Sequence, residues 1–285
     1  MNSKWWGAKQ NLSIDKFLEF NNDGWFEIEE YDGDVEVYVK NIDLLENNKP
    51  LLICFTAAVP NREVREYPFF SGIKLSQDLG FPLIAISDPS LKLSKNLNLA
   101  WYAGSKHKPY LQRSLSSFLF KLSCKLTVPP LLVGGSGGGY AALSMKAINP
   151  SLNANALVWN PQTSITNYYQ RFVKAYSKVC FDFDPVSYPS DLKEYLDRVG
   201  VSHDISGTCF SGDGKVLYFQ NLSDESHLKK HCNLVIERNH YKKIEKKTFD
   251  EYVFHGGCIR VGDWSRGHSS IPNDVFLNAV NEIYG

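Results

Sequence analysis

The sequence has no excess charge and no long apolar run, and each absence argues against a class of function. Its 285 residues include 31 Lys and Arg against 31 Asp and Glu, so the formal net charge is zero. Without a basic excess we expect no nucleic-acid partner and no attraction to an anionic membrane surface. No stretch of about 18 apolar residues occurs, so we expect no membrane span. The N-terminal residues MNSKWWGAKQNLSIDKF contain no apolar signal-peptide core, and secretion is not expected.

Paired cysteines are absent as well. None of the six cysteines forms a C-x-x-C pair, and several lie inside apolar runs. They are Cys54, Cys124, Cys180, Cys209, Cys232 and Cys258. This usage favours reduced, mostly buried thiols in a cytoplasmic protein over a disulfide framework. No His or Cys pair has the spacing of metal ligands, so we expect no bound metal.

What the sequence does contain is a series of short apolar runs, within a hydrophobic content of 43%. Six runs are each followed by a loop, and most of those loops by a helix-like segment: 50–59, 81–89, 129–136, 154–162, 214–224 and 256–264. Short runs with little alternation are typical of strands buried on both faces of a parallel sheet. Helical spacing appears at 110–126, at 139–148 and at 272–285, where Pro272 lies near the start.

The order of these segments predicts the fold class. Residues 25–42, WFEIEEYDGDVEVYVKNI, have two β-rich halves around Asp32-Gly33-Asp34, which indicates a hairpin. An antiparallel start followed by strand–helix units predicts one α/β domain over 1–285, with a mostly parallel mixed sheet and helices on both faces. Residues 163–213 interrupt the pattern with two helical segments and no strand between them. We expect a helical cap inserted there, over the carboxyl edge of the sheet.

Residues 131–150, LLVGGSGGGYAALSMKAINP, surround one serine with glycines between an apolar run and a helical segment. A phosphate-binding loop would need a Lys-Ser or Lys-Thr pair, which is missing. A dinucleotide fingerprint would need a glycine at Tyr140 and an acidic residue about 20 positions later, and neither is present. The G-x-S-x-G pattern at 134–138 instead indicates a strained strand-to-helix turn that exposes Ser136 as a nucleophile. A tight turn without chemistry is the alternative.

The partners of Ser136 can be sought at the carboxyl ends of the strands, where ligands bind to an open parallel sheet. Asp224 follows the run at 214–224 and is the candidate acid, although it could simply cap the next helix. His268 follows the last run and is the candidate base. His240 is its main rival, if NLVIERN is the terminal strand, and His255 precedes the last run.

The oxyanion site should combine two backbone N–H groups. The first belongs to Gly137, directly after the serine, where the start of a helix leaves N–H groups free. The second should come from the loop after LLICF, where the chain reads Thr56-Ala57-Ala58-Val59, and we favour Ala58. An ordinary strand end is the alternative.

Three of these stretches resemble a known superfamily. LLVGGSGGGYAAL, VLYFQNLSDESH and GDWSRGHSSIP resemble the nucleophile elbow, acid loop and histidine loop of α/β-hydrolases, in the same order Ser136, Asp224, His268. More narrowly, FTAAVPNREVREYPFFSG, ISDPS, WYAG and WNPQTSI are similar to bacterial surface-glycan proteins, some of them serine O-acetyltransferases. Many α/β-hydrolases have His-Gly or a glycine run at the oxyanion loop, where this chain has Thr-Ala-Ala.

These observations predict serine-dependent acyl transfer through an acyl-enzyme. Water as acceptor would make the protein an esterase, and a sugar hydroxyl an O-acyltransferase; the resemblance alone suggests acetyl-CoA as donor, and no other cofactor is expected. Trp101, Tyr102, Tyr168 and Tyr169 lie near predicted carboxyl-edge loops and would suit a carbohydrate ring, although core packing is the commoner use of aromatic residues. A hydrolase-like scaffold that only binds a ligand is the alternative. The oligomeric state is not predicted.

Overall fold

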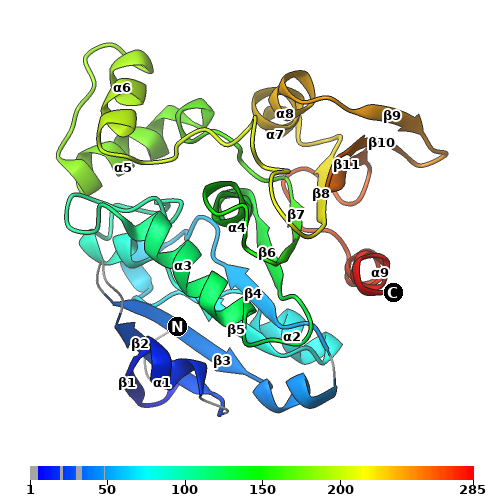
Figure 1. The fold of residues 1–285 in the computed structure, drawn as a ribbon. Coiled ribbons are helices and arrows are strands. Elements are labelled where there is room, and N and C mark those ends of the chain that lie inside the picture. Colours follow the sequence, from blue (N-terminus) through cyan, green and yellow to red (C-terminus); the bar gives the residue numbers. More distant parts are fainter. Residues whose placement is uncertain (1–5, 20–21, 30–33, 48) are drawn as a thin grey trace.

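The computed structural model describes residues 6–19, 22–29, 34–47 and 49–285. In these residues, eleven strands form one sheet in the order β1-β2-β3-β5-β4-β6-β7-β8-β11-β10-β9 (Figure 1). The strands are β1 (Lys9–Ser13), β2 (Gly24–Glu29), β3 (Val35–Lys40), β4 (Leu52–Phe55), β5 (Leu83–Ile86), β6 (Leu131–Gly135), β7 (Asn155–Trp159), β8 (Val216–Asn221), β9 (Lys242–Glu245), β10 (Phe249–Phe254) and β11 (Gly257–Gly262).

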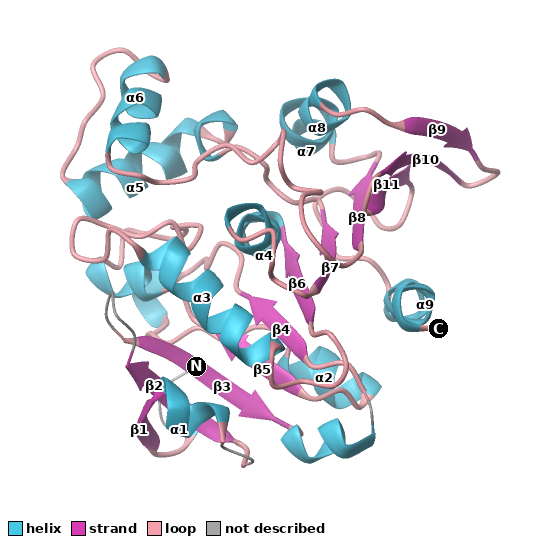
Figure 2. Ribbon diagram, in the orientation of Figure 1, coloured by secondary structure: helices cyan, strands magenta, loops and turns pink. Residues whose placement is uncertain are grey.

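Helices cover both faces of this sheet (Figure 2). They are α1 (Ile14–Leu18), α2 (Ile73–Leu79), α3 (Leu111–Ser123), α4 (Ser136–Ile148), α5 (Gln170–Phe181), α6 (Ser190–Arg198), α7 (Glu225–His227), α8 (Asn233–Arg238) and α9 (Asn273–Tyr284). The mostly parallel α/β architecture is therefore confirmed. The three predicted helices correspond to α3, α4 and α9, and Pro272 is the residue directly before α9.

The six predicted strands are β4, β5, β6, β7, β8 and β11, and they lie side by side as one parallel block. Their side chains alternate between two cores, as strand geometry requires. In β4, Ile53 and Phe55 belong to the core that also contains α3 and α4 residues, whereas Leu52 and Cys54 belong to the core formed with α9. Burial on both faces explains why these runs are almost continuously apolar.

Both ends of the sheet contain antiparallel pairs, although the outermost pair at one end, β1 with β2, is parallel. β2 and β3 form the predicted hairpin, although Asp32 and Gly33 lie outside the described residues. At the other end β10 pairs with β11 and with β9, and neither strand was predicted. The NLVIERN segment is mostly helix α8, not a terminal strand, so the premise that favoured His240 as the base is wrong.

Residues 163–213 contain α5 and α6 and, in the described chain, no strand beyond one isolated bridge between Ser164 and Asp204. Figure 1 shows α5 and α6 next to each other at one end of the molecule, beyond α3. The Trp101 ring lies 5.5 Å from Tyr176 of α5, which joins this segment to the main core.

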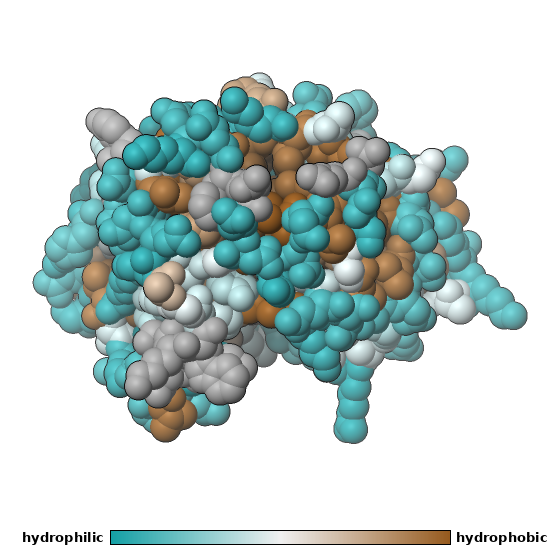
Figure 3. All heavy atoms as spheres, turned by 90° about the horizontal axis from the view of Figure 1, so that it is seen from below, coloured by the Kyte–Doolittle hydropathy of each residue, from teal (hydrophilic) through white to brown (hydrophobic). Residues whose placement is uncertain are grey.

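The face shown in Figure 3 is largely hydrophilic, with hydrophobic side chains exposed in separate groups. Among the described residues, none of the helices combines the length and apolarity needed to cross a membrane. All six cysteines are free thiols, and five of them are buried, as predicted. The cytoplasmic location stays a prediction.

Candidate active site

Ser136 lies at the sharp turn between β6 and α4. The strand ends at Gly135, the helix begins at Ser136, and Ser136 adopts a left-handed φ of +54°. Such a conformation is strained for a residue with a side chain. A methyl group on Gly134 or Gly138 would come within 3.0 Å of backbone atoms, those of Gly138 and Phe55 respectively. The glycines therefore let the backbone pack tightly enough to hold the serine outward.

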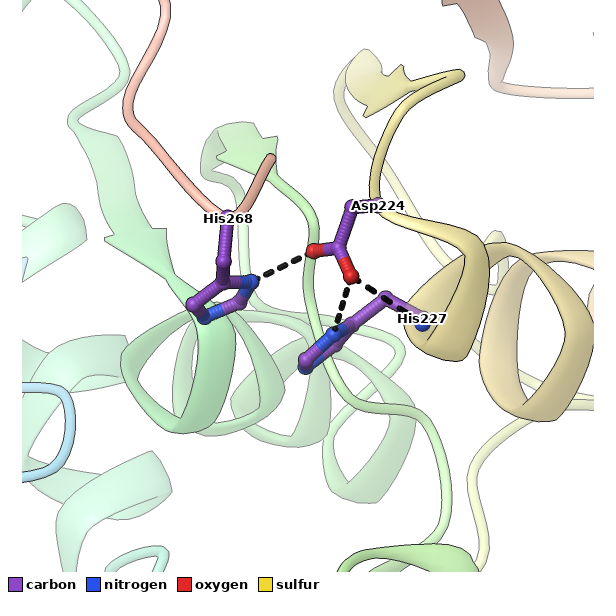
Figure 4. Close-up of side chains that lie close together, drawn as sticks. All are labelled: Asp224, His227 and His268. Carbon is purple, nitrogen blue, oxygen red and sulfur yellow. Dashed lines mark hydrogen bonds and ion pairs between the residues drawn. The ribbon is translucent and has the colours of Figure 1, made fainter. Parts of the chain in front are cut away.

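Asp224 and His268 come together after two neighbouring strands. Asp224 follows β8 and His268 follows β11, and the parallel register pairs Asn221 with Gly262 at the ends of these strands. His268 Nδ1 lies 2.5 Å from Asp224 Oδ2 (Figure 4). Asp224 also accepts the backbone N–H of His227 at 3.4 Å, so it caps α7 while contacting His268. Asp224 therefore makes the contact expected of a helix cap and also the contact with His268 expected of the candidate acid.

Ser136 and His268 line the same cavity, which has a volume of about 470 Å³. Its other walls come from β4, β6, β7, α2 and α9 and include Val133, Trp159 and Phe276. In the described part of the chain no hydrogen bond joins Ser136 to His268. The rival histidines lie elsewhere: His240 and His255 line a second cavity, together with Asp213 at the amino end of β8.

Neither predicted oxyanion donor, Gly137 or Ala58, is among the residues that line this cavity. Gly137 is in the first turn of α4, where a backbone N–H has no helical acceptor. In the loop after β4, the N–H of Thr56 already donates to the Tyr102 hydroxyl at 2.7 Å. The cavity is lined by Ala57, whereas Ala58 is not among its lining residues.

His227 was not predicted as part of the site, but it contacts both Asp224 and His268. Its side chain is 3% exposed, and its Nδ1 lies 3.1 Å from Asp224 Oδ1. Its ring stacks on His268 with centroids 4.1 Å apart and an interplanar angle of 21° (Figure 4). One carboxylate thus contacts the Nδ1 atoms of two stacked imidazoles.

Burial and hydrogen bonding act in opposite directions on these groups. Burial raises the pKa of Asp224, but the hydrogen bonds from His227 and His268 outweigh it and hold the pKa well below its usual range. Burial lowers the pKa of His227, against an opposing hydrogen bond from Asp224. Burial also lowers the pKa of the neighbouring His231 to about 3. Asp224 is therefore ionised, and His231 neutral, at neutral pH.

Two buried asparagines hold the loop that carries His268. Asn221, the last residue of β8, donates to Ser265 Oγ at 3.0 Å and to the carbonyls of Gly267 and Ser269 at 3.0 and 3.1 Å. Asn160, after β7, donates to the same Ser269 carbonyl at 3.1 Å. A loop anchored at these points keeps the imidazole near Asp224.

Of the aromatic residues singled out in the sequence, two belong to the core and one lies at the site. Trp101 and Tyr102 are core residues, at most 1% exposed. Tyr168 does lie at the site: burial raises the pKa of its hydroxyl, and a side-chain interaction with Ser136 opposes that rise.

Asp224, His227 and His268 are also the described residues that could hold a metal ion. One ligand atom from each lies within 4.8 Å of the others. Two imidazoles and a carboxylate are ligand types that zinc accepts. Here, however, the carboxylate contacts the Nδ1 atoms of both rings, which is the geometry of a hydrogen-bonded group.

The sheet order, the serine turn after β6 and the loops after β8 and β11 define the α/β-hydrolase fold. Solved structures share it. The capsule O-acetyltransferase of Neisseria meningitidis serogroup A is 14% identical, with a TM-score of 0.54, over 92% of this chain and 96% of that chain. The S-formylglutathione hydrolase from Agrobacterium tumefaciens is 14% identical, with a TM-score of 0.54, over 92% and 95%.

The acetyl xylan esterase from Paenibacillus sp. R4 is 14% identical, with a TM-score of 0.56, over 90% of this chain and 82% of that chain. No protein-family model matches the sequence, and no curated protein matches it in sequence. At such low identity the similarity establishes the fold alone, and it confirms the α/β-hydrolase fold expected from the sequence.

Proposed function

We propose that the protein is a serine-dependent acyl-transfer enzyme, an esterase or an O-acyltransferase, in which Ser136, His268 and Asp224 act as a triad. One observation carries the proposal. Ser136, in a strained backbone conformation, lines a cavity together with His268, and His268 is hydrogen-bonded to the Asp224 carboxylate. The strained backbone at Ser136 is expected of a nucleophile, because it points the hydroxyl away from the main chain toward the carbonyl carbon of a substrate.

The acylation step follows from these contacts. His268 Nδ1–H donates to Asp224, so the other ring nitrogen, Nε2, can take the proton of Ser136. Ser136 Oγ bonds to the acyl carbon, and the carbonyl oxygen gains the negative charge. The N–H groups of Gly137 and of Ala58 or its cavity-lining neighbour Ala57 stabilise that charge. Asp224 stabilises the imidazolium, which then gives its proton to the leaving group.

The acceptor decides which enzyme this is. Water would release a free acid, and a sugar hydroxyl would leave an acylated glycan. Acetyl-CoA is our proposed donor for the transferase, and a carbohydrate or small ester the proposed substrate. We assign residues 163–213 to a cap beside the site, because Tyr168 at its start interacts with Ser136 and its ring centroid lies 5.8 Å from that of His227.

A fluorophosphonate probe tests the nucleophile. The wild-type protein should be labelled, and Ser136→Ala should not be, because the probe reacts with an activated serine. Hydrolysis of p-nitrophenyl acetate should fall by up to about 10⁶-fold in the same variant. Equal labelling of both proteins would refute the role of Ser136.

A second assay separates the two activities. The protein is incubated with p-nitrophenyl acetate or acetyl-CoA, with and without a sugar acceptor, and the acceptor is analysed by mass spectrometry. An acetylated sugar, absent with Ser136→Ala, indicates a transferase. Free acetate alone indicates an esterase.

A further inference from the structure

The side chain of Gln162 contacts the proposed nucleophilic atom, Ser136 Oγ. It follows β7, the strand next to β6, and is completely buried. Its Nε2 donates a hydrogen bond to Ser136 Oγ at 3.0 Å. Its backbone N–H donates to the Ser136 carbonyl at 3.1 Å. Both contacts join the end of β7 directly to the serine turn.

The orientation of this amide is fixed by Trp101. The indole nitrogen of Trp101 donates to Gln162 Oε1. An indole N–H can only donate, so the oxygen of the amide must face Trp101 and the nitrogen must face Ser136. Trp101 is itself held in place, because it is fully buried and its ring packs edge-on against Tyr168 and Tyr176. The Gln162 N–H group is thus oriented toward Ser136 before a substrate binds.

This contact directs the proton of Ser136. A serine hydroxyl has one proton and two lone pairs. The Gln162 amide nitrogen occupies a lone pair and cannot accept the proton, which must go to another group. The Tyr168 hydroxyl interacts with Ser136, and His268 lines the same cavity. The ring nitrogen of a neutral imidazole accepts a proton more readily than a phenol oxygen does.

We propose that Gln162 is a further catalytic residue, which directs the Ser136 proton toward His268 and stabilises Oγ as it becomes negative. The inference rests on the proposed function. In acylation the Ser136 O–H bond breaks, the proton moves to His268 Nε2, and the Oγ electron pair forms the bond to the acyl carbon. In deacylation the acceptor hydroxyl gives its proton to His268 as its oxygen bonds to the acyl carbon; the bond to Oγ then breaks, and Oγ takes that proton from His268. The Gln162 N–H stabilises Oγ in both steps.

The substitution Gln162→Glu tests this role. Glutamate retains an oxygen for the Trp101 indole but places a carboxylate oxygen, not an N–H, against Ser136. Gln112→Glu is the matched control, because Gln112 is also buried and bonded on both amide atoms, but to the backbone of Ser202. The readout is the second-order rate constant of fluorophosphonate labelling at Ser136, with thermal unfolding measured for each variant.

We expect Gln162→Glu to label about 10- to 100-fold more slowly than wild type, the range of one hydrogen bond to a charged group, whereas Gln112→Glu labels at the wild-type rate. With p-nitrophenyl acetate, kcat should fall while KM stays within about twofold. If Gln162→Glu does not fold, Gln162→Met, which has a similar shape and no N–H donor, should show the same loss.

A folded Gln162→Glu or Gln162→Met that labels as fast as wild type would overturn the inference and leave the proposed function intact. An equal slowing in Gln112→Glu would also overturn it, because the effect would then come from burying a carboxylate anywhere in the protein. Wild-type protein that is not labelled at Ser136 would instead refute the proposed function, and this inference with it.

Discussion

Asp224 accepts hydrogen bonds from two side chains that have different exposure. His268 is 42% exposed on the cavity wall, whereas His227 is 3% exposed beneath it. The exposed imidazole can meet a substrate, and the buried one cannot. We therefore assign proton transfer to His268 and the positioning of the carboxylate to His227.

This division predicts unequal effects of substitution. His268→Ala should lower the labelling rate of Ser136 at least about 10³-fold. His227→Phe retains a ring against His268 but removes one hydrogen bond to Asp224, so it should lower the rate about tenfold. Labelling kinetics at pH 7.5 measure both. Equal losses would contradict the assignment, and a larger loss in His227→Phe would make His227 the base.

The lowered pKa of the buried His231 predicts that the stability of the protein depends on pH. Its pKa is about 3 in the folded protein and near its ordinary 6.5 when unfolded. Between these values the unfolded state binds more protons, so the free energy of unfolding rises with pH and falls on acidification.

His231→Asn retains an acceptor for the Thr163 N–H, which now donates to His231 Nδ1 at 3.3 Å. Relative to this variant, wild type should lose up to about 1.4 kcal/mol more per pH unit below pH 6. Urea unfolding at pH 5 and pH 7 measures the difference. Parallel stability profiles would show that His231 titrates alike in both states.

At the scale of the element, the strand-to-helix turn depends on missing side chains. Gly138→Ala should lower the free energy of unfolding by about 1–3 kcal/mol, because its methyl group would come within 3.0 Å of the Phe55 carbonyl oxygen. Gly207→Ala is the control, since nothing lies within 4 Å of a methyl group there. Chemical denaturation of both variants checks this, and a similar small change in both would contradict it.

The elements that could be predicted from the sequence are those with a simple burial pattern. β4, β6 and β8 are buried along their whole length, and continuous apolar runs reveal such strands. β10, FDEYVF, is buried at only two of its six positions, and β9, KKIE, is exposed throughout. Polar strands near the edge of a sheet resemble loops in sequence, which is why both were missed.

The candidate site could likewise be predicted only in part from the sequence. Ser136, Asp224 and His268 follow strands and lie at one edge of the sheet, so the strand-end rule brought them together. Gln162 was not foreseen, because its contact with Ser136 depends on β7 lying beside β6 and on the Trp101 indole, which orients its amide. His227 was missed because the sequence does not reveal that the short α7 turns its imidazole back toward Asp224.

At the scale of the whole molecule, the site draws on the ends of five strands, and the triad that we propose would act without a metal. We expect prolonged treatment with EDTA to leave fluorophosphonate labelling and the thermal midpoint unchanged. A known zinc esterase treated in parallel verifies that chelation is complete. Loss of labelling that added Zn²⁺ restores would show instead that Asp224, His227 and His268 hold a metal ion.

The strand β9 ends the sheet with Lys242 and Lys243, and all four of its residues are exposed. An outer strand normally offers free backbone groups onto which another chain can add. Here an incoming strand would have to lie along Lys242 and Lys243, and a second copy in parallel, in-register pairing would bring like charges together. A short edge strand with charged side chains disfavours the addition of such a strand.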